Sequence, residues 1–388
     1  MTAAAPLAQT ELASSRVSRH AAALSNQLRS LGTSLFPPSA RKSLRSFTSG
    51  EVSRIVGVSD GYLRQLSIDG LGPSPAIGSA GRRSYTLGQI NELRGYLSSA
   101  RPRETLQFSP GRRNGEKLQV VTVANFKGGS AKTTTALYLT QFLALQGFRV
   151  LAIDLDPQAS LSAMFGYQPE FDIPENATLY GAIRYDDQRR PMQEVVRETY
   201  FEGVGLVPGN LELMEFEHHT PRAMLDRGFR GHELFFRRVA GAIDQVANQF
   251  DVVVIDCPPQ LGYLTMGALN AATAMLVTIH PQMVDVASMS QFLLMTSDLM
   301  AIIENAGGRL DYDFIRYVVA LLRNLFGDDV LKATAWKSTA IANSGLTKQS
   351  LYELDRGSVG RAAYDRALES VDAVNAEIAT LIKKVWAR

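Results

Sequence analysis

A glycine-rich run between residues 127 and 135 contains the residue types that bind a nucleotide's phosphates. It reads Lys-Gly-Gly-Ser-Ala-Lys-Thr-Thr-Thr and follows the apolar stretch 118–126. Backbone N–H groups of such a turn, and of the helix that it opens, bind phosphate oxygens. Lys132 would add a positive charge, and the Thr133 hydroxyl could bind Mg²⁺. The spacing therefore predicts a nucleotide-binding protein.

The run departs from the common phosphate-binding pattern G-x-x-x-x-G-K-[ST]. That pattern would need glycine where this chain has Phe126 and Ala131. The deviant form K-G-G-x-x-K-[ST] fits instead, with an additional lysine, Lys127, before the glycines. The alternative is an ordinary glycine turn between a strand and a helix, with lysines that are only solvated.

Carboxylates at the ends of two further apolar runs argue against that alternative. One run, from residue 149, ends at Asp154 and Asp156, and another, from residue 251, ends at Asp256. The carboxyl ends of parallel strands meet at one edge of an α/β sheet, so we expect these acids beside the glycine-rich turn. Mg²⁺ binds oxygen ligands and keeps several waters, which suits such a site. The order of elements predicts an α/β fold: a P-loop, doubly wound, mostly parallel sheet. For Asp156, the cap of a following helix is an alternative role.

These motifs resemble those of a known family. Residues 127–134, 154–158 (Asp-Leu-Asp-Pro-Gln) and 256–259 (Asp-Cys-Pro-Pro) look like the ParA/MinD group of deviant-Walker ATPases. The last two motifs have the forms of the ParA branch, which segregates plasmids and chromosomes. The likeness covers about residues 118–388. Within the branch, the subgroup of RepA partition ATPases from repABC plasmids is similar at 337–342, 345–353 and 374–378.

The resemblance implies a role for each residue of the site. The catalytic residues would be Lys132, Lys127, which would reach across a homodimer to the partner's nucleotide, and Asp156, which would orient the attacking water. Thr133 would hold Mg²⁺ together with Asp154 and Asp256. ATP would be bound by Lys127, Gly128, Gly129, Ser130, Ala131, Lys132, Thr133 and Thr134.

Two departures from the family pattern bear on that site. The family usually has glycine at Ala131, so a positive φ there would cost on the order of 1–2 kcal/mol. After the expected strand 312–319 the chain runs directly into 320–326, where related proteins have a longer loop that helps to hold adenine. We therefore assign no base-contacting residue there. The expected strand 274–280 is followed by what resembles the family's next active-site loop, with Pro281, Gln282 and Asp285.

Residues 46–100 have the pattern of a small DNA-binding domain. Thr48 and Glu51 form a capping box before one short helix, and a glycine turn and Ser59 precede a second. Two such helices, followed by a basic hairpin candidate at 81–85, resemble a MerR-like winged helix-turn-helix. The alternative is a helical packing module with a solvated arginine pair. The residues expected to contact DNA are Ser59, Tyr62, Arg64, Arg82 and Arg83.

Charge and cysteine content narrow the class of protein. The net charge of the 388 residues is +2, but residues 1–117 carry 16 Lys and Arg against 7 Asp and Glu, and residues 118–388 carry 24 against 31. A basic front part suggests an acidic partner such as DNA. The single cysteine, Cys257, rules out a disulfide framework and indicates a reducing compartment. It also excludes the nitrogenase iron-protein relatives, whose cluster needs two cysteines in each subunit.

The sequence also predicts where the protein acts. We find no signal peptide and no apolar run that could span a membrane, so a cytoplasmic, nucleoid-associated protein is expected. Residues 371–388 have the pattern of an amphipathic helix, which MinD relatives use on membranes. Packing within the fold is the favoured interpretation here. A membrane-oscillating MinD-like ATPase is the alternative, and the basic front part opposes it.

The expected organisation has four parts. Residues 1–45 form a helical segment that could dimerise, 46–100 the DNA-binding domain, 101–117 a linker and 118–388 the ATPase domain. The expected function is that of a weak partition ATPase. Its ATP-bound homodimer would bind nucleoid DNA, a ParB-like centromere-binding protein would stimulate hydrolysis, and the front domain would bind an operator and repress its own operon. The alternative is a transcriptional repressor whose nucleotide site is degenerate and does not hydrolyse ATP.

Overall fold

The structure, a computed structural model, divides the chain into two compact units, Met1–Lys42 and Ser43–Arg388. The described residues are 12–35, 42–78, 81–125, 127–225, 234–279, 283–318, 322–334, 338–358 and 360–388. The first unit contains one long helix, α1 (Ala13–Leu35). Large apolar side chains of this segment are exposed at Leu12, just before α1, and at Val17 and Leu24.

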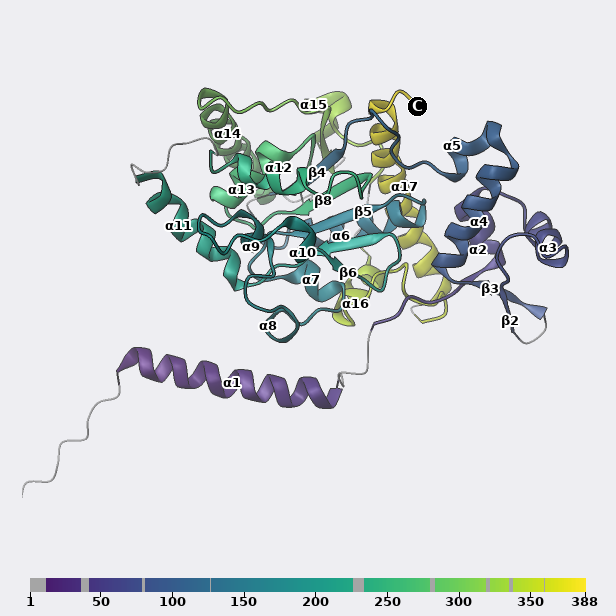
Figure 1. Ribbon diagram of the computed structural model, residues 1–388, viewed down its shortest axis with the longest axis horizontal. Coiled ribbons are helices and arrows are strands. Elements are labelled where there is room, and N and C mark those ends of the chain that lie inside the picture. Colours follow the sequence, from purple (N-terminus) through teal and green to yellow (C-terminus); the bar gives the residue numbers. More distant parts are fainter. Residues whose placement is uncertain are drawn as a thin grey trace, which may run out of the picture. The chain divides into compact units, whose positions relative to one another are not determined.

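The second unit is built around a mostly parallel seven-stranded sheet (Figure 1). Its strand order is β10-β9-β4-β8-β5-β7-β6, and only the pairing of the edge strand β6 with β7 is antiparallel. The predicted α/β fold with a mostly parallel sheet is confirmed. The strands are β4 (Gln119–Ala124), β5 (Val150–Asp154), β6 (Arg197–Glu198), β7 (Val204–Val207), β8 (Val252–Asp256), β9 (Ala274–Thr278) and β10 (Phe314–Val318).

Helices cover both faces of this sheet, so its central strands β4, β5, β8 and β9 are buried at every position and mostly apolar rather than alternating. On one face, Val121 and Val123 of β4 pack with α6 (Lys132–Leu145) and α17 (Arg361–Val385). On the other face, Val120 belongs to a separate apolar cluster. That cluster includes residues of α12 (Arg237–Asp244), α13 (Tyr263–Ala271) and α14 (Met283–Asn305).

The apolar side of the C-terminal helix is buried. Val374, Ile378 and Ile382 of α17 are at most 4% exposed and belong to the same apolar cluster as α6. This agrees with packing within the fold, which the sequence favoured. Among the described residues, no helix has the length and apolar content needed to cross a membrane.

Shorter helices connect these elements. They are α7 (Ser160–Met164), α8 (Pro169–Asp172), α9 (Leu179–Ile183), α10 (Met192–Val195), α11 (Met214–Leu225), α15 (Arg323–Phe326) and α16 (Thr339–Leu346). Single 3₁₀ turns occur at Pro102–Glu104, Leu211–Leu213 and Gly327–Asp329.

A small module of helices and short strands precedes the sheet domain. The Thr48 hydroxyl accepts the backbone N–H of Glu51, whose carboxylate accepts that of Thr48, so the predicted capping box is present. The Ser59 hydroxyl caps the next helix as predicted. The helices are α2 (Ser49–Val56), α3 (Asp60–Ile68), α4 (Leu87–Ala100) and α5 (Thr105–Phe108). An antiparallel sheet of order β1-β3-β2 joins β1 (Phe47–Thr48), β2 (Ala76–Ile77) and β3 (Arg83–Tyr85).

The stretch expected to be a linker, residues 101–117, is folded against its neighbours. It contains a 3₁₀ turn and α5, and the Phe108 side chain is fully buried. The backbone N–H of Arg112 donates to Asp251, which lies just before β8. One large apolar side chain anchors this segment, although its prolines, glycines and arginines are typical of an open linker.

A buried arginine joins the front module to the sheet domain. The Arg94 guanidinium, on α4, donates to the carbonyl oxygens of Leu145 (2.9 Å), Ile55 (3.0 Å) and Phe108 (3.4 Å). These carbonyls lie in the last turns of α6, α2 and α5, where the helix dipoles favour a cation. Burial lowers the pKa of Arg94 to about 10, which still leaves it protonated at neutral pH. Gly147 leaves room for it, since a Cβ there would lie 3.0 Å from the Arg94 Cδ.

Candidate nucleotide-binding site

The glycine-rich turn joins β4 to α6, as the sequence predicts. Ala131 is the residue before α6 and has φ 66° and ψ 21°, so the strained left-handed conformation that would favour glycine is present. Lys132 opens the helix, and its ammonium donates to the Lys127 carbonyl oxygen at 3.2 Å. The Lys127 backbone N–H donates to the Asn125 side chain. The turn therefore folds back so that the side chain of Lys132 reaches the backbone of Lys127.

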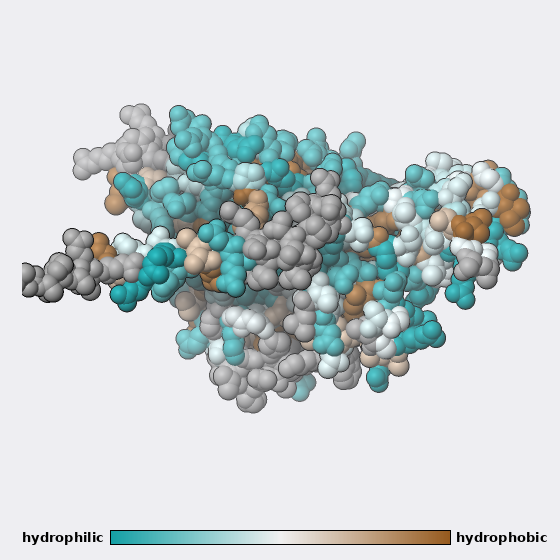
Figure 2. All heavy atoms as spheres, turned by 90° about the horizontal axis from the view of Figure 1, so that it is seen from below, coloured by the Kyte–Doolittle hydropathy of each residue, from teal (hydrophilic) through white to brown (hydrophobic). Residues whose placement is uncertain are grey.

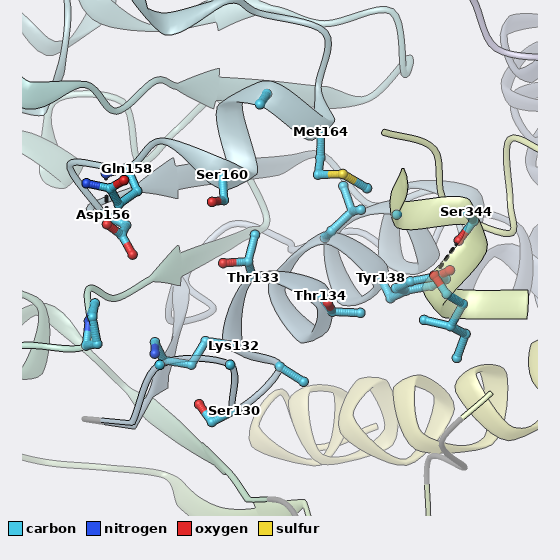
Figure 3. Close-up of a pocket in the computed structure, with 18 of the residues that line it drawn as sticks. Ser130, Lys132, Thr133, Thr134, Tyr138, Asp156, Gln158, Ser160, Met164 and Ser344 are labelled. Atoms are coloured by element: carbon cyan, nitrogen blue, oxygen red, sulfur yellow. Dashed lines mark hydrogen bonds between the residues drawn. The ribbon is translucent and has the colours of Figure 1, made fainter. Parts of the chain in front are cut away.

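A cavity of about 690 Å³ lies over this turn and the first half of α6 (Figure 3). Its size lies within the usual range of small-molecule sites, roughly 300–1,000 Å³. Every residue from Gly128 to Thr134 lines it, which places the expected phosphate-binding residues together, except that Lys127 is not among the described lining residues. In Figure 3, Asp156 and Lys132 lie toward one end of the cavity, and Tyr138 and Ser344 toward the other.

The far end of the cavity was not predicted from the sequence. Ser344 and Gln349, from α16 and the turn after it, line the cavity together with Tyr138 of α6. The Tyr138 hydroxyl accepts the backbone N–H of Leu351 at 3.0 Å and also bonds the Ser344 side chain (Figure 3). Burial raises the pKa of Tyr138 to about 12. Neither Tyr138 nor Ser344 was singled out from the sequence, so no sequence signal identified this end.

Asp256 is a fully buried carboxylate at the end of β8. By hydrogen-bond geometry neither of its oxygens has a partner among the described residues, although the Thr133 hydroxyl is close enough to lower its pKa. Burial raises its pKa well above the usual value and the charge of Asp154 adds to this, while Thr133 and Lys132 act in the opposite direction. Leaving a buried carboxylate without partners is costly. A cation beside Thr133 and Asp256 would remove that cost, so these two residues fit the expected metal site.

Asp154 is also fully buried, but its oxygens are engaged within the protein. One accepts the backbone N–H of Asp156 (3.2 Å), and the other accepts both the N–H and the hydroxyl of Ser162 (2.8 Å each). Burial raises its pKa to about 6, and the bonds from Ser162 oppose that rise. This carboxylate holds the loop after β5, and its place in the Mg²⁺ shell stays a prediction. Ser162 was not identified from the sequence.

Asp156 lines the cavity, at the same end as Lys132. Its carboxylate accepts the backbone N–H of Gln158 at 2.9 Å. The residue preceding α7 is Ala159, so the alternative role of Asp156 as a helix cap is wrong. Burial lowers the pKa of Lys132, while the charges of Asp256 and Asp156 raise it.

Some expected residues cannot be placed. Pro281 and Gln282 lie outside the described residues, as does the side chain of Asp285. The start of the segment in which the adenine loop is shortened, residues 319–321, also lies outside them.

The five expected DNA contacts lie on the front module and differ in their surroundings. Arg64 and Arg82 are exposed. Arg83 Nε donates to the Ser67 hydroxyl of α3 at 3.2 Å, which ties the hairpin to that helix. The Tyr62 ring is half-buried under the Arg101 guanidinium, 4.5 Å from the ring centre.

Apolar side chains are also exposed on this module. Figure 2 shows apolar surface at its end. The exposed apolar residues of the module include Ile68, Leu71 and Ile77, which belong to the region of α3 and β2. The surface near the expected DNA contacts is therefore mixed, with arginines beside apolar groups.

Comparison with known proteins shows which family the chain belongs to. Residues 118–306 match the family described as AAA domain. A relative from Rhizobium rhizogenes, named for replication protein A, is 51% identical over 384 residues, which cover 95% of each chain. The chromosome partitioning protein ParA of Myxococcus xanthus is 32% identical over 199 residues, 51% of this chain and 65% of the relative.

Among solved structures, one described as a partition protein is similar with a TM-score of 0.64 at 17% identity, covering 96% of this chain and 98% of the other. At that identity the likeness concerns the fold, and its coverage includes the front module as well as the sheet domain. The near full-length identity to replication protein A is the stronger finding. The chain belongs to the ParA-type family of partition ATPases and is similar over nearly its full length to the rhizobial replication protein A chain.

Proposed function

We propose that this chain is a partition ATPase that binds ATP and Mg²⁺ in the cavity over α6 and hydrolyses ATP slowly. The observation that carries the proposal is the turn from Gly128 to Thr134, which lines the cavity together with Asp156 and whose Lys132 and Thr133 act on the buried carboxylate of Asp256. Phosphoryl transfer depends mainly on positioning and on charge neutralisation, which lysines and carboxylates can supply without a covalent nucleophile.

Each residue has a distinct task in this proposal. Backbone N–H groups of the turn and the Lys132 ammonium bind the phosphates. Thr133 and Asp256 hold Mg²⁺, which supplies positive charge to the phosphate oxygens when bound. Asp156 orients the attacking water. Lys127 acts on the nucleotide of a second subunit, so that ATP drives homodimerisation.

The wider cycle includes DNA and a partner protein. Residues 46–100 bind an operator as a winged helix-turn-helix and repress the protein's own operon. The ATP-bound dimer binds nucleoid DNA without sequence preference, and a ParB-like centromere-binding protein stimulates hydrolysis. Residues 1–45, with the exposed apolar side chains of α1, contribute to dimerisation. The glycine turn between α2 and α3 and the hairpin tied to α3 by Arg83 support the DNA-binding role.

ATP turnover tests the enzymatic part. Wild type, Lys132→Gln and Lys117→Gln are compared, each with and without bulk double-stranded DNA. Lys117 is a matched control because it precedes β4, at the other end of that strand, and its ion pair with Asp313 is partly exposed. We expect slow turnover in wild type and Lys117→Gln and none in Lys132→Gln.

A second candidate function is a nucleotide-sensing repressor that does not hydrolyse ATP. The observation that favours it is the left-handed conformation of Ala131, which costs on the order of 1–2 kcal/mol relative to glycine within the phosphate turn. ATP binding without turnover above that of Lys132→Gln would select this function over the partition ATPase.

Salt-dependent operator binding tests the DNA-binding part. Replacing Arg82 and Arg83 by alanine is expected to weaken operator affinity and to reduce the slope of log K against log salt, by about 1 for each DNA phosphate that is no longer neutralised. Arg103→Ala, an exposed arginine before α5, is the control. An unchanged slope in the double variant would contradict DNA binding through the hairpin.

A further inference from the structure

The carboxylate of Asp154 is the centre of a buried hydrogen-bond network. It accepts the N–H of Asp156 at one oxygen, and the N–H and hydroxyl of Ser162 at the other. The Ser162 hydroxyl in turn accepts the backbone N–H of Gly209 at 2.9 Å. Asp154 and Ser162 are both 0% exposed. The serine hydroxyl donates its one proton to Asp154 while it accepts from Gly209, so both of its functions are used.

Gly209 allows three chain segments to meet at this point. A Cβ at residue 209 would lie 2.9 Å from the Asp156 carbonyl oxygen and 3.0 Å from that of Asp154. Those distances are shorter than a carbon can approach without displacing the backbone. The end of β5, helix α7 and the segment after β7 therefore converge on one carboxylate, and only a residue without a side chain fits at position 209.

Asp154 and Asp256 differ in their hydrogen-bond partners, and this difference indicates a role for the network around Asp154. Asp154 and Asp256 are directly opposite each other in the parallel pairing of β5 with β8. Asp256 has both oxygens without partners among the described residues, whereas three donors occupy Asp154. One of those donors is the backbone N–H of Asp156, the residue that reaches the cavity. The orientation of Asp154 therefore fixes where the Asp156 backbone lies.

We propose that Ser162 is a positioning residue for ATP hydrolysis, which orients Asp154 and through it Asp156, and that Gly209 completes the same network. The inference rests on the proposed function, in which Asp156 orients the attacking water. Ser162 itself is not among the described lining residues, although Ser160, Ala163 and Met164 of the same helix are, and it makes no described hydrogen bond to the turn 128–134. We therefore expect its loss to act on the placement of Asp156 more than on nucleotide affinity.

The test uses the full chain with Ser162→Ala, Ser162→Thr and a control, Ser370→Ala. Ser370 is another buried serine, 7% exposed, whose hydroxyl donates to the Ala367 carbonyl within α17. Because misplacement of a reacting group by about 1 Å can cost about 100-fold in rate, we expect kcat for ATP to fall roughly 10- to 100-fold in Ser162→Ala. Affinity for a fluorescent ATP analogue is expected to stay near that of wild type. Ser162→Thr, which keeps the hydroxyl, recovers most of kcat, and Ser370→Ala leaves kcat unchanged.

A second measurement does not depend on turnover. In nucleotide-free protein, backbone hydrogen exchange followed by mass spectrometry should speed up in Ser162→Ala for peptides covering 154–162 and 207–210, and not for peptides of α17. Gly209→Ala should show the same exchange pattern and the same selective loss of kcat. Three results for Ser162→Ala would overturn the proposal. They are a wild-type kcat, a parallel loss of ATP affinity and kcat, and unchanged hydrogen exchange in these peptides. Wild type without turnover would refute the proposed function instead, and the exchange result would still decide whether Ser162 holds the Asp156 segment.

Discussion

Asp154 and Asp256 are the same residue type, lie opposite each other on neighbouring strands and are both fully buried, yet their chemistry differs. Burial raises the pKa of each. Asp154 is surrounded by N–H and O–H donors that favour its charged form. Asp256 has no hydrogen-bond partner by geometry among the described residues, and a bound cation would stabilise its charge. Hydrogen-bond donors, and not residue type, therefore separate the loop-holding carboxylate of Asp154 from Asp256, the one proposed to bind the metal.

Replacing each acid by asparagine should have opposite effects on stability. Asp256→Asn removes a buried carboxylate whose charge Lys132 and Thr133 offset only in part, and we expect nucleotide-free protein to become more stable by about 1–3 kcal/mol. Asp154→Asn places an amide among donors and should destabilise by a similar amount, about 1–3 kcal/mol. Urea unfolding measures both. Equal destabilisation by the two substitutions would contradict the difference in their surroundings.

The same groups predict how stability depends on pH. An acid whose pKa is higher in the folded chain binds more protons when folded than when unfolded at intermediate pH. For Asp154, with a folded pKa of about 6, the contribution to stability is therefore present at low pH and is lost as pH rises from about 4 to about 6. Asp256, whose pKa is also raised, adds a loss of the same sign. Unfolding free energies of nucleotide-free wild type and Asp256→Asn across this range should show a shallower decline in the variant.

At the scale of elements, the sequence predicted what local pattern determines. Strands buried on both faces appear as continuous apolar runs, so the sheet was predictable, and the caps at Thr48 and Ser59 follow from local hydrogen bonding. The phosphate turn was predictable because its function fixes both residue types and spacing. Long-range pairing was not: Ser162 with Asp154, and Tyr138 with Leu351, are polar contacts between segments that carry no shared pattern. Phe108 was missed because the residues around it are typical of linkers.

The packing of α16 against α6 gives a prediction at this scale. Tyr138→Phe removes the hydroxyl that accepts the Leu351 N–H, and the unpaired N–H should cost about 1–3 kcal/mol. Because Ser344 and Gln349 then lose their support at the far end of the cavity, ATP affinity should also fall. Tyr312→Phe is the control, since its hydroxyl bonds the Leu269 carbonyl and it is not among the described lining residues. Isothermal titration with ATP should separate the two variants, and equal affinities would contradict a role for this wall.

At the scale of the whole second unit, two arginines attach the front module to the elements of the nucleotide site. Arg94 caps α6, the helix that begins at the phosphate turn. Arg45 forms an ion pair with Glu51 of α2 and donates to the Tyr352 carbonyl, in the segment that follows the cavity wall. Both arginines therefore connect the front module, through backbone carbonyls, to segments next to the candidate nucleotide site: the end of α6 and the segment after Gln349.

Arg94→Lys tests the first of these attachments. Lysine keeps the charge but has no planar fork that can reach three carbonyls from one position, so at least one helix end should be left without its donor. We expect a loss of about 1–3 kcal/mol in unfolding free energy. Arg64→Lys, on the exposed side of α3, is the control and should stay within about 0.5 kcal/mol of wild type. Equal stability of both variants would show that the three hydrogen bonds are dispensable.

The Arg94 attachment also limits how this architecture can be recombined. A front module cut from a relative at residues 101–117 and joined to this sheet domain would bring an α4 that must place a guanidinium against the end of α6, next to the space left by Gly147. The hybrid needs arginine at position 94 of its front module and glycine at position 147 of its sheet domain. Without both, the carbonyl at the end of α6 would be buried without a hydrogen-bond donor. We therefore expect that a front module can be exchanged between relatives only together with the C-terminal end of the α6 that it contacts.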